Sequence, residues 1–355
     1  MKQTLSLVMI VKNEESTLER CLSSIVSSVN EVVIVDTGST DSTKQIALKY
    51  GALIFDYQWN GDFAEARNFA LSKSTSQWNL VLDADEYISN NCGNVIQQFI
   101  KGEPAIGRVK IVDKFMGSDG ISFEQNYISR LLPSSCRYMG RIHEQVVSNL
   151  PRIIVDVEVQ HDGYFQQKKS DRNIPILKQE ITDNPNNPYY HYQIAKEYRG
   201  LENHEDSYLH LKKAYSLITH KEGYAPSLIV NFMYAIMSSG HLSDGLVVIE
   251  NEEEFLKSFA DFQFVSGLYL LELILSNPDQ YGKLLPYIER FYLCAIEIGE
   301  TGLEGSVIGT GSFAAHHNLG VFYEVVGNIQ KAKEQYVKAT AYDYKPSLDR
   351  LINLG

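Results

Sequence analysis

The sequence predicts two domains of different class: an α/β domain with a mostly parallel sheet, followed by an all-α domain of helical repeats. Three observations support this division. Apolar segments of strand length alternate with amphipathic helical segments over the first ~90 residues, a β-rich pattern follows from Lys101, and the chain is almost entirely helical from about Lys168. We place the domains at residues 1–167 and 168–355, which fits the usual domain size of about 150 residues.

Composition and charge exclude several classes of protein. A net charge of −12 argues against nonspecific nucleic-acid binding, which depends on clustered Lys and Arg. The four cysteines are scattered without metal-ligand spacing, as is typical of reduced thiols. The apolar run at 5–11 lacks a following cleavage site, and the longest apolar stretch, 262–275, is too short to span a membrane. We therefore expect a cytoplasmic protein without transmembrane segments or nucleic-acid partners.

The first elements set the pattern of the predicted sheet. Residues 5–11 are nearly continuously apolar, which is typical of a strand buried on both faces. We expect a helix to begin near Glu14, with Asn13 as its N-cap, because apolar residues recur at helical spacing after it. Residues 31–35 form the second predicted strand, which ends at Asp36.

Strands and helices continue to alternate after Asp36, which implies right-handed βαβ units. Gly51 suits the C′ position of the next helix. The predicted elements are a helix at 41–50, a strand at 52–55, a helix at 63–74, a strand at 78–82, and β-rich segments at 107–115, 123–132 and 153–160.

The helical half contains two segments that share one template. Residues 194–214 and 319–339 both place an aromatic residue at +3, a small residue at +12 and an apolar residue at +16 from a small residue, as tetratricopeptide repeats do. Pro346 also suits the end of the later unit. Between them we expect further amphipathic helices, at 227–239, 244–258, 264–275 and 284–298.

Polar residues lie where the predicted parallel strands end, the edge at which open α/β sheets bind ligands. Asp83-Ala84-Asp85 directly follows a buried strand, and its two carboxylates can face one direction. Such a pair repels unless a cation lies nearby, and a hard divalent ion completed by phosphate oxygens meets that need. Capping of the following turn is the alternative for an isolated pair. The strand-end position beside Asp36 favours the ligand site.

Four segments in register carry a resemblance to a known family: residues 7–15, 33–43, 63–68 and 82–86. Their order and spacing resemble glycosyltransferase family 2, which implies the GT-A fold of inverting nucleotide-sugar transferases. The resemblance is strong over residues 3–100 and weaker to about residue 170. A nucleotidyltransferase is disfavoured because residues 11–15 are not a Gly-rich, basic phosphate loop.

The resemblance implies roles for individual residues. Asp36 would bind the nucleoside, and Arg67 would lie near the base or phosphates. Asp85 would coordinate Mg²⁺ or Mn²⁺, and Asp83 would contact the ribose or the metal. Thr37 departs from the family, since many members carry a second acid there. A surface ion pair is the alternative for Arg67. The complete predicted set of nucleotide-sugar contacts is Val11, Asn13, Asp36, Arg67, Asp83, Ala84 and Arg130.

Two later residues complete the predicted chemistry. Glu144, in a His-Glu segment that resembles the family's, would be the base that deprotonates the acceptor, although better-known members use Asp. His161 ends an extended segment, where a neutral imidazole could complete the metal site opposite Asp85. A partly buried structural histidine is the alternative for His161, and a solvated strand residue is the alternative for Arg130.

The combination of domains resembles the sublancin-type peptide glycosyltransferases, and helical repeats can hold extended peptides. We therefore expect transfer from a UDP-sugar to a hydroxyl or thiol of a peptide or protein acceptor. Transfer to a surface glycan or lipopolysaccharide-type acceptor is the alternative. A non-catalytic binding protein, in which the repeats form a scaffold and the transferase domain is degenerate, is the alternative from a different functional class. Such a protein would not be expected to bind UDP with Mn²⁺. Exposed repeat ends also suggest pairing of copies into a homo-oligomer.

Overall fold

The computed structural model describes residues 3–117, 120–161, 169–301, 303 and 305–354. The strands are β1 (Leu5–Val11), β2 (Glu31–Asp36), β3 (Leu53–Asp56), β4 (Trp78–Val81), β5 (Glu86–Ile88), β6 (Ile106–Gly117), β7 (Gly120–Pro133), β8 (Arg137–Met139), β9 (Gln145–Val147), β10 (Arg152–His161) and β11 (Ser306–Val307). The helices are α1 (Leu18–Ile25), α2 (Thr43–Lys49), α3 (Phe63–Lys73), α4 (Gly93–Ile100), α6 (Ser170–Asp183), α7 (Pro188–Gly200), α8 (His204–Leu217), α9 (Ala225–Ser238), α10 (Gly245–Glu252), α11 (Ala260–Ser276), α12 (Pro278–Tyr281), α13 (Leu285–Ile298), α14 (Phe313–Val325), α15 (Ile329–Thr340) and α16 (Lys345–Asn353).

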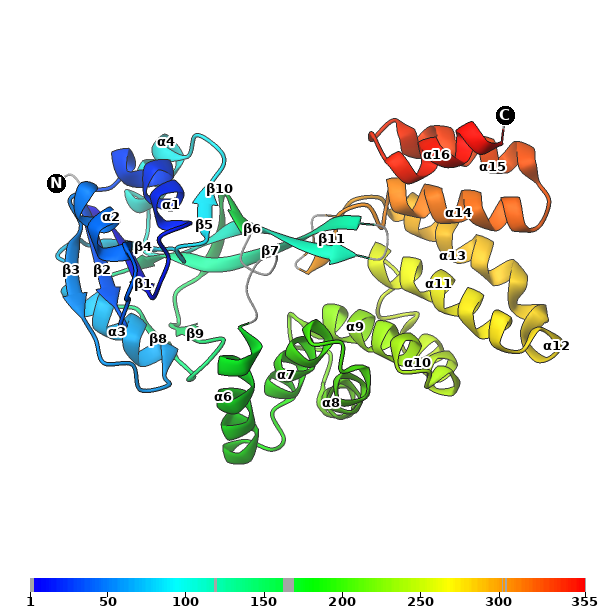
Figure 1. Ribbon diagram of the computed structural model, residues 1–355, viewed down its shortest axis with the longest axis horizontal. Coiled ribbons are helices and arrows are strands. Elements are labelled where there is room, and N and C mark those ends of the chain that lie inside the picture. Colours follow the sequence, from blue (N-terminus) through cyan, green and yellow to red (C-terminus); the bar gives the residue numbers. More distant parts are fainter. Residues whose placement is uncertain (1–2, 118–119, 162–168, 302, 304, 355) are drawn as a thin grey trace. The chain divides into compact units, whose positions relative to one another are not determined.

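The main sheet has the strand order β3-β2-β1-β4-β7-β6-β10-β5 (Figure 1). Strands β3, β2, β1 and β4 are parallel, and β7 joins β4 in the antiparallel direction. Strand β10 is parallel to β6 and antiparallel to β5. The predicted fold class is confirmed: a GT-A-like α/β sheet domain precedes a helical domain.

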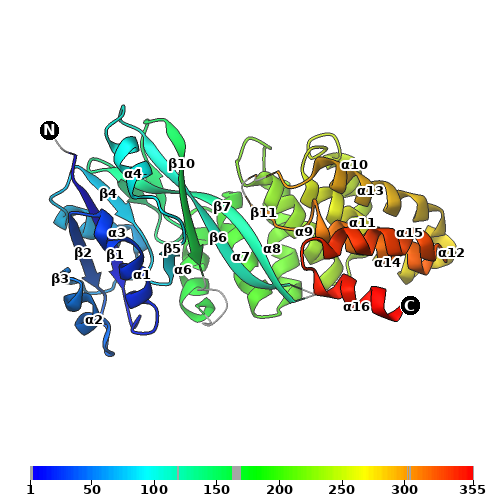
Figure 2. The same cartoon turned by 90° about the horizontal axis from the view of Figure 1, so that it is seen from above.

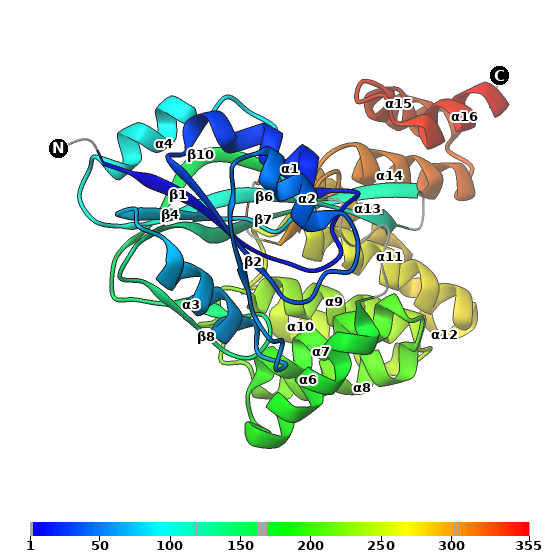
Figure 3. The same cartoon turned by 60° about the vertical axis from the view of Figure 1, so that its left-hand side comes forward.

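Side-chain alternation along β1 divides the core of this sheet between its two faces. Leu5, Leu7 and Met9 belong to the apolar cluster that contains residues of α1 and α4. Val8 points the other way, into the cluster that contains residues of α3. Helices α1 and α4 therefore cover one face and α3 covers the other (Figure 3). The strand is buried on both faces, as its continuous apolar run predicted.

The predicted start of the first helix is wrong. Helix α1 begins at Leu18, and Asn13 is not its N-cap but has a left-handed backbone with φ 56°. Polar contacts hold the preceding residues in a loop instead: the Asn13 amide donates to Ser39 Oγ (2.9 Å), and Asn13 Oδ1 accepts from the Thr40 amide (2.8 Å). The loops after β1 and β2 are thereby tied together where both strands end.

The chain divides into two compact units, residues 1–116 with 125–180 and residues 117–124 with 181–355. The predicted domain boundary between residues 167 and 168 falls in segment 162–168, outside the described residues. Strands β6 and β7 form a long ribbon (Figure 2), and residues 117–124 at its tip belong to the second unit. There the Ile308 amide donates to the Phe123 carbonyl at 2.8 Å.

Stacked helix pairs build the second unit, in which each helix packs on its neighbour in the chain from α7 to α9 and from α13 to α16. Asn187, Asn203 and Asn328 cap α7, α8 and α15 with their side chains. A Cβ at position 320 would come within 2.6 Å of the Tyr336 ring. The close packing of these two repeat positions therefore requires glycine at position 320. The tetratricopeptide-like interpretation is confirmed.

One predicted helix of this unit is shorter than expected. The segment predicted as helical from 244 to 258 forms α10, which ends at Glu252, and residues 253–258 are turn. The apolar side chains of Leu256 and Phe259 are nevertheless buried, because the turn brings them back to the core. No helix within the described ranges is long and apolar enough to cross a membrane.

A buried carboxyl group in the second unit should make its stability depend on pH. Asp261 is 2% exposed, and its Oδ1 accepts from the Val307 amide at 2.8 Å. Its Oδ2 has no hydrogen-bond partner among the described residues. Burial, with a smaller contribution from Glu124, raises the pKa of Asp261 from 3.8 to about 7.

Asp261→Asn should therefore stabilise the protein at high pH. The folded chain retains a proton that the unfolded chain releases, so stability from this group is present below pH ~4 and lost as pH rises through ~7. At pH ~8 the variant should gain on the order of 3 kcal/mol over the wild type, and below pH ~4 the gain should vanish. Urea unfolding followed by far-UV circular dichroism at both pH values tests this. An equal effect at both would contradict it.

Candidate functional site

The parallel strands bring three predicted residues to one edge of the sheet. Val11 and Asp36 are register partners at the ends of β1 and β2, and Asp83 follows β4, the other neighbour of β1. Asp36 is 1% exposed, and its carboxylate accepts from the amides of Gly38 (3.2 Å) and Ser39 (3.0 Å). Its predicted contact with a nucleoside stays a prediction.

Thr37, the departure from the family, has a structural role in this loop. Its amide and hydroxyl both donate to the Val11 carbonyl, at 2.9 and 3.1 Å. The hydroxyl is therefore turned toward the end of β1. Val11 and Ala84 are both buried.

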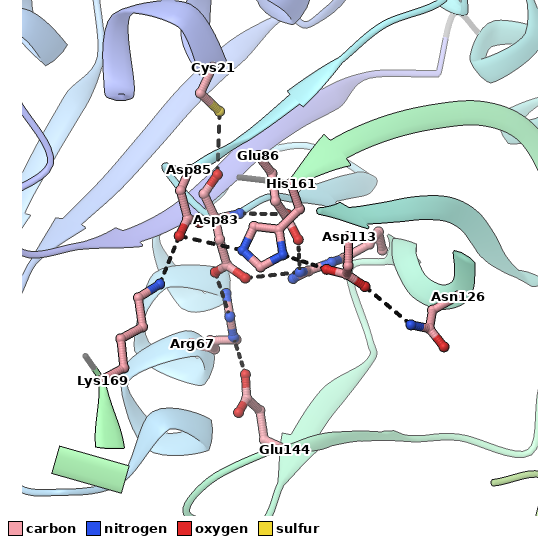
Figure 4. A network of polar contacts seen from close by, with 11 residues as sticks. Cys21, Arg67, Asp83, Asp85, Glu86, Asp113, Asn126, Glu144, His161 and Lys169 are labelled. Atoms are coloured by element: carbon pink, nitrogen blue, oxygen red, sulfur yellow. Dashed lines mark hydrogen bonds and ion pairs between the residues drawn. The ribbon is translucent and has the colours of Figure 1, made fainter. Parts of the chain in front are cut away.

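Two arginines from distant elements hold the first aspartate of the Asp83-Ala84-Asp85 motif, and Figure 4 labels one of them, Arg67. Arg67 Nη2, from α3, donates to Asp83 Oδ1 at 2.7 Å, and Arg130 Nη2, from β7, donates to Oδ2 at 2.9 Å. Burial alone would raise the pKa of Asp83, but the two guanidinium groups outweigh it and hold the pKa well below its usual range. Asp83 is therefore ionised at neutral pH.

Both arginines are only 7% exposed, so the alternatives of a surface pair for Arg67 and a solvated residue for Arg130 are wrong. Arg67 Nε also donates to Glu144 Oε1, and Arg130 Nη2 also donates to Glu86 Oε1. Arg67 thus connects the predicted base to the predicted diphosphate site. Arg67 Nη1 and Arg130 Nε are buried without a hydrogen-bond partner among the described residues.

The second aspartate of the motif faces the predicted histidine. His161 Nε2 lies 3.4 Å from Asp85 Oδ2, and His161 Nδ1 lies 2.6 Å from Asp113 Oδ1 (Figure 4). Burial opposes the charge on the imidazole, but these two carboxylates raise the pKa of His161 to about 11. Burial likewise opposes charge on Asp85, whose pKa His161 and Lys169 nevertheless lower to about 2. The pair is ionised at neutral pH in this arrangement.

These donors fit a divalent metal ion. Asp85 and His161 supply one oxygen and one nitrogen at a spacing close to the ~3 Å expected for adjacent octahedral ligands at ~2.1 Å. Asp113 would orient the imidazole from its far side, as carboxylates commonly do for metal-bound histidine. Within the described ranges no three His, Cys, Asp or Glu side chains converge as a complete metal site. Diphosphate oxygens would supply the remaining hard ligands.

The charges of this network also favour a divalent cation. Its carboxylates are Asp83, Asp85, Glu86, Asp113 and Glu144, and its permanent cations are Arg67, Arg130 and Lys169. With His161 neutral, as a ligand must be, five carboxylates against three cations leave two negative charges. One Mg²⁺ or Mn²⁺ would neutralise that excess.

Three members of the network were not among the residues predicted from the sequence. Glu86 adjoins the aspartate motif, and its Oε2 accepts from the Asp83 amide at 2.8 Å. Asp113 lies in a strand that was predicted, but its partner His161 is 48 residues away. Lys169 Nζ donates to Asp85 Oδ2 at 2.7 Å, and no local pattern marks it. Of the predicted residues, Asn13 lies in the loop after β1 and Asp36 lies at the end of β2, outside this network.

Comparison with known proteins matches the first unit to a family. Residues 6–148 match the model described as Glycosyl transferase family 2. Over 295 residues the chain is 24% identical to the SPbeta prophage-derived glycosyltransferase SunS of Bacillus subtilis, a match that covers 76% of this chain and 68% of SunS. A TPR repeat-containing protein of Synechococcus elongatus is 48% identical over 81 residues, 23% of this chain and 20% of that protein.

Among solved structures, the chain is similar to glucosyl-3-phosphoglycerate synthase from Mycobacterium tuberculosis, crystallised with Mn²⁺, UDP-glucose and phosphoglyceric acid. The identity is 25% with a TM-score of 0.26, and the match covers 31% of this chain and 44% of that enzyme. The chain thus spans less than half the length of that enzyme.

Proposed function

Residues 6–148 form a family 2 glycosyltransferase domain, and from that premise we propose that the protein transfers a sugar, with inversion, from a UDP-sugar to a hydroxyl or thiol. The observation that carries the proposal is the contact between Arg67 and both Asp83 and Glu144. This contact joins the carboxylate pair at the end of the strand to the separate carboxylate of Glu144 in one site. Such a site would provide both requirements of a displacement: a place for the leaving diphosphate and a base for the acceptor.

Asp85 and His161 would hold Mg²⁺ or Mn²⁺ at the donor side. When bound, the ion neutralises negative charge that develops on the departing nucleoside diphosphate. Asp83 keeps its orientation through Arg67 and Arg130. The low pKa of Asp83 keeps it charged at neutral pH.

Glu144 would act as the base. Its only hydrogen bond among the described residues goes from Arg67 to Oε1, which leaves Oε2 able to accept a proton. The acceptor O–H or S–H proton passes to Oε2 as the acceptor atom bonds to the anomeric carbon. The bond from that carbon to the diphosphate oxygen breaks, and the nucleoside diphosphate leaves with the electron pair.

A peptide or protein is the proposed acceptor class. The second unit is a stack of helix pairs, and such stacks form concave surfaces on which extended chains bind. The sublancin-type resemblance of the motifs supports the same class. A comparison of transfer to peptide and to glycan acceptors distinguishes it from a transferase of surface glycans.

A donor screen tests the function. The full chain is incubated with Mn²⁺ and with UDP-, GDP- or dTDP-sugars, and release of each nucleoside diphosphate is measured. Metal-dependent release from a UDP-sugar is expected. Absence of release from every donor, and absence of UDP binding, would support the rival scaffold.

Glu144→Gln should separate donor binding from transfer. The amide oxygen of Gln still accepts from Arg67, so affinity for UDP with Mn²⁺ should stay close to that of the wild type. Loss of a general base should lower the transfer rate by ~10²–10⁴-fold. Glu103→Gln, at an exposed position, is the matched control and should transfer normally. Full transfer by Glu144→Gln would remove Glu144 from the mechanism.

A further inference from the structure

Lys169 occupies a defined position beside the proposed metal site. Its carbonyl accepts from the amides of Arg172 (3.1 Å) and Asn173 (3.0 Å), so the start of α6 fixes its backbone. Its Nζ donates to Asp85 Oδ2 at 2.7 Å (Figure 4). The Lys169 side chain is 31% exposed and that of Asp85 is 10% exposed, so water screens this pair only in part.

The ammonium group contacts the same carboxylate oxygen that faces His161. Asp85 Oδ2 lies 2.7 Å from Lys169 Nζ and 3.4 Å from His161 Nε2. A divalent ion bound at this oxygen would lie within a few ångströms of the ammonium group. Two cations at that separation repel strongly where water is partly excluded. Lys169 and the metal therefore compete for Asp85.

We propose that Lys169 holds Asp85 in the metal-free protein and makes strong metal binding conditional on an anionic diphosphate. The inference rests on the proposed function, because it takes the nucleoside diphosphate as the anion. A bound diphosphate adds the negative charge that lets metal and ammonium lie near one another. Metal and nucleotide thus bind with positive coupling, which by linkage is equal in both directions.

The test measures Mn²⁺ affinity by calorimetry, with and without saturating UDP, in the full-length protein. Lys169→Gln should bind Mn²⁺ alone at least ~10-fold more tightly than the wild type, the lower end for close charge pairs. The factor by which UDP strengthens Mn²⁺ binding should shrink correspondingly. Lys169→Arg keeps the charge and should stay close to the wild type. Lys101→Gln is the control, because Lys101 is exposed at the end of α4.

Two results would overturn the inference. If Lys169→Gln binds Mn²⁺ alone no more tightly than the wild type, Lys169 does not compete with the metal. If UDP strengthens Mn²⁺ binding equally in both proteins, Lys169 does not produce the coupling. In either case the proposed function stands if the wild type binds UDP with Mn²⁺. Failure of the wild type to bind that pair would overturn both proposals.

Discussion

Asp85→Ala should abolish sugar transfer while the protein remains folded. The substitution removes the carboxylate that would hold the metal, and it leaves Lys169 and His161 as two cations without their shared anion. We expect a fall in kcat/KM on the order of a thousandfold or more, because charge on the leaving diphosphate is no longer neutralised. In this variant, Mn²⁺ should also no longer strengthen the binding of UDP.

The experiment compares turnover of the UDP-sugar and UDP binding in Asp85→Ala and Asp156→Ala. Asp156 is exposed on β10, so its removal changes the net charge equally without touching the network. Circular dichroism checks that both variants are folded. Wild-type turnover in Asp85→Ala would show that the metal lies elsewhere or is not needed.

Arg130→Met should destabilise the first unit severely. The substitution leaves Glu86, which is 2% exposed, without its cation, and it removes one of two donors to Asp83. Breaking a buried ion pair from one side typically costs ~3–5 kcal/mol. Both tryptophans of the chain, Trp59 and Trp78, lie in the first unit. Urea unfolding followed by tryptophan fluorescence therefore reports on this unit.

The double variant Arg130→Met/Glu86→Gln is the matched comparison. Gln removes the uncompensated charge but keeps an oxygen that can accept from the Asp83 amide, as Glu86 Oε2 does at 2.8 Å. It should recover a large part of the stability that Arg130→Met alone loses. A double variant no more stable than Arg130→Met would mean that loss of packing, rather than the unpaired charge, causes the defect.

Local patterns predicted most of the fold. The continuous apolar run of β1 and the helical spacing after it depend on neighbours a few residues apart. The start of α1 could not be predicted in this way. Asparagine is a favourable N-cap residue, but hydrogen bonds with Ser39 and Thr40 of the next loop hold Asn13 outside the helix. Tertiary contacts here outweigh a local preference.

Only some residues of the network were predicted, and none of their connections. Asp83, Asp85 and His161 could be found because motif spacing and strand ends mark them. The two arginines on Asp83 come from positions 16 and 47 residues away, and Lys169 is 84 residues from Asp85. Such pairs form only when the sheet is assembled. Sequence spacing therefore could not show that Asp83 is held by arginines while Asp85 faces the imidazole.

Equilibrium binding of UDP is the decisive measurement for the Asp83-Ala84-Asp85 site. Calorimetry of the wild-type chain with UDP, first with and then without Mn²⁺, measures whether the strand-end carboxylates form a metal-dependent nucleotide site. We expect UDP binding that Mn²⁺ strengthens in the wild type and in Asp156→Ala but not in Asp85→Ala. UDP binding that Mn²⁺ strengthens equally in Asp85→Ala, or no binding by the wild type, would contradict it.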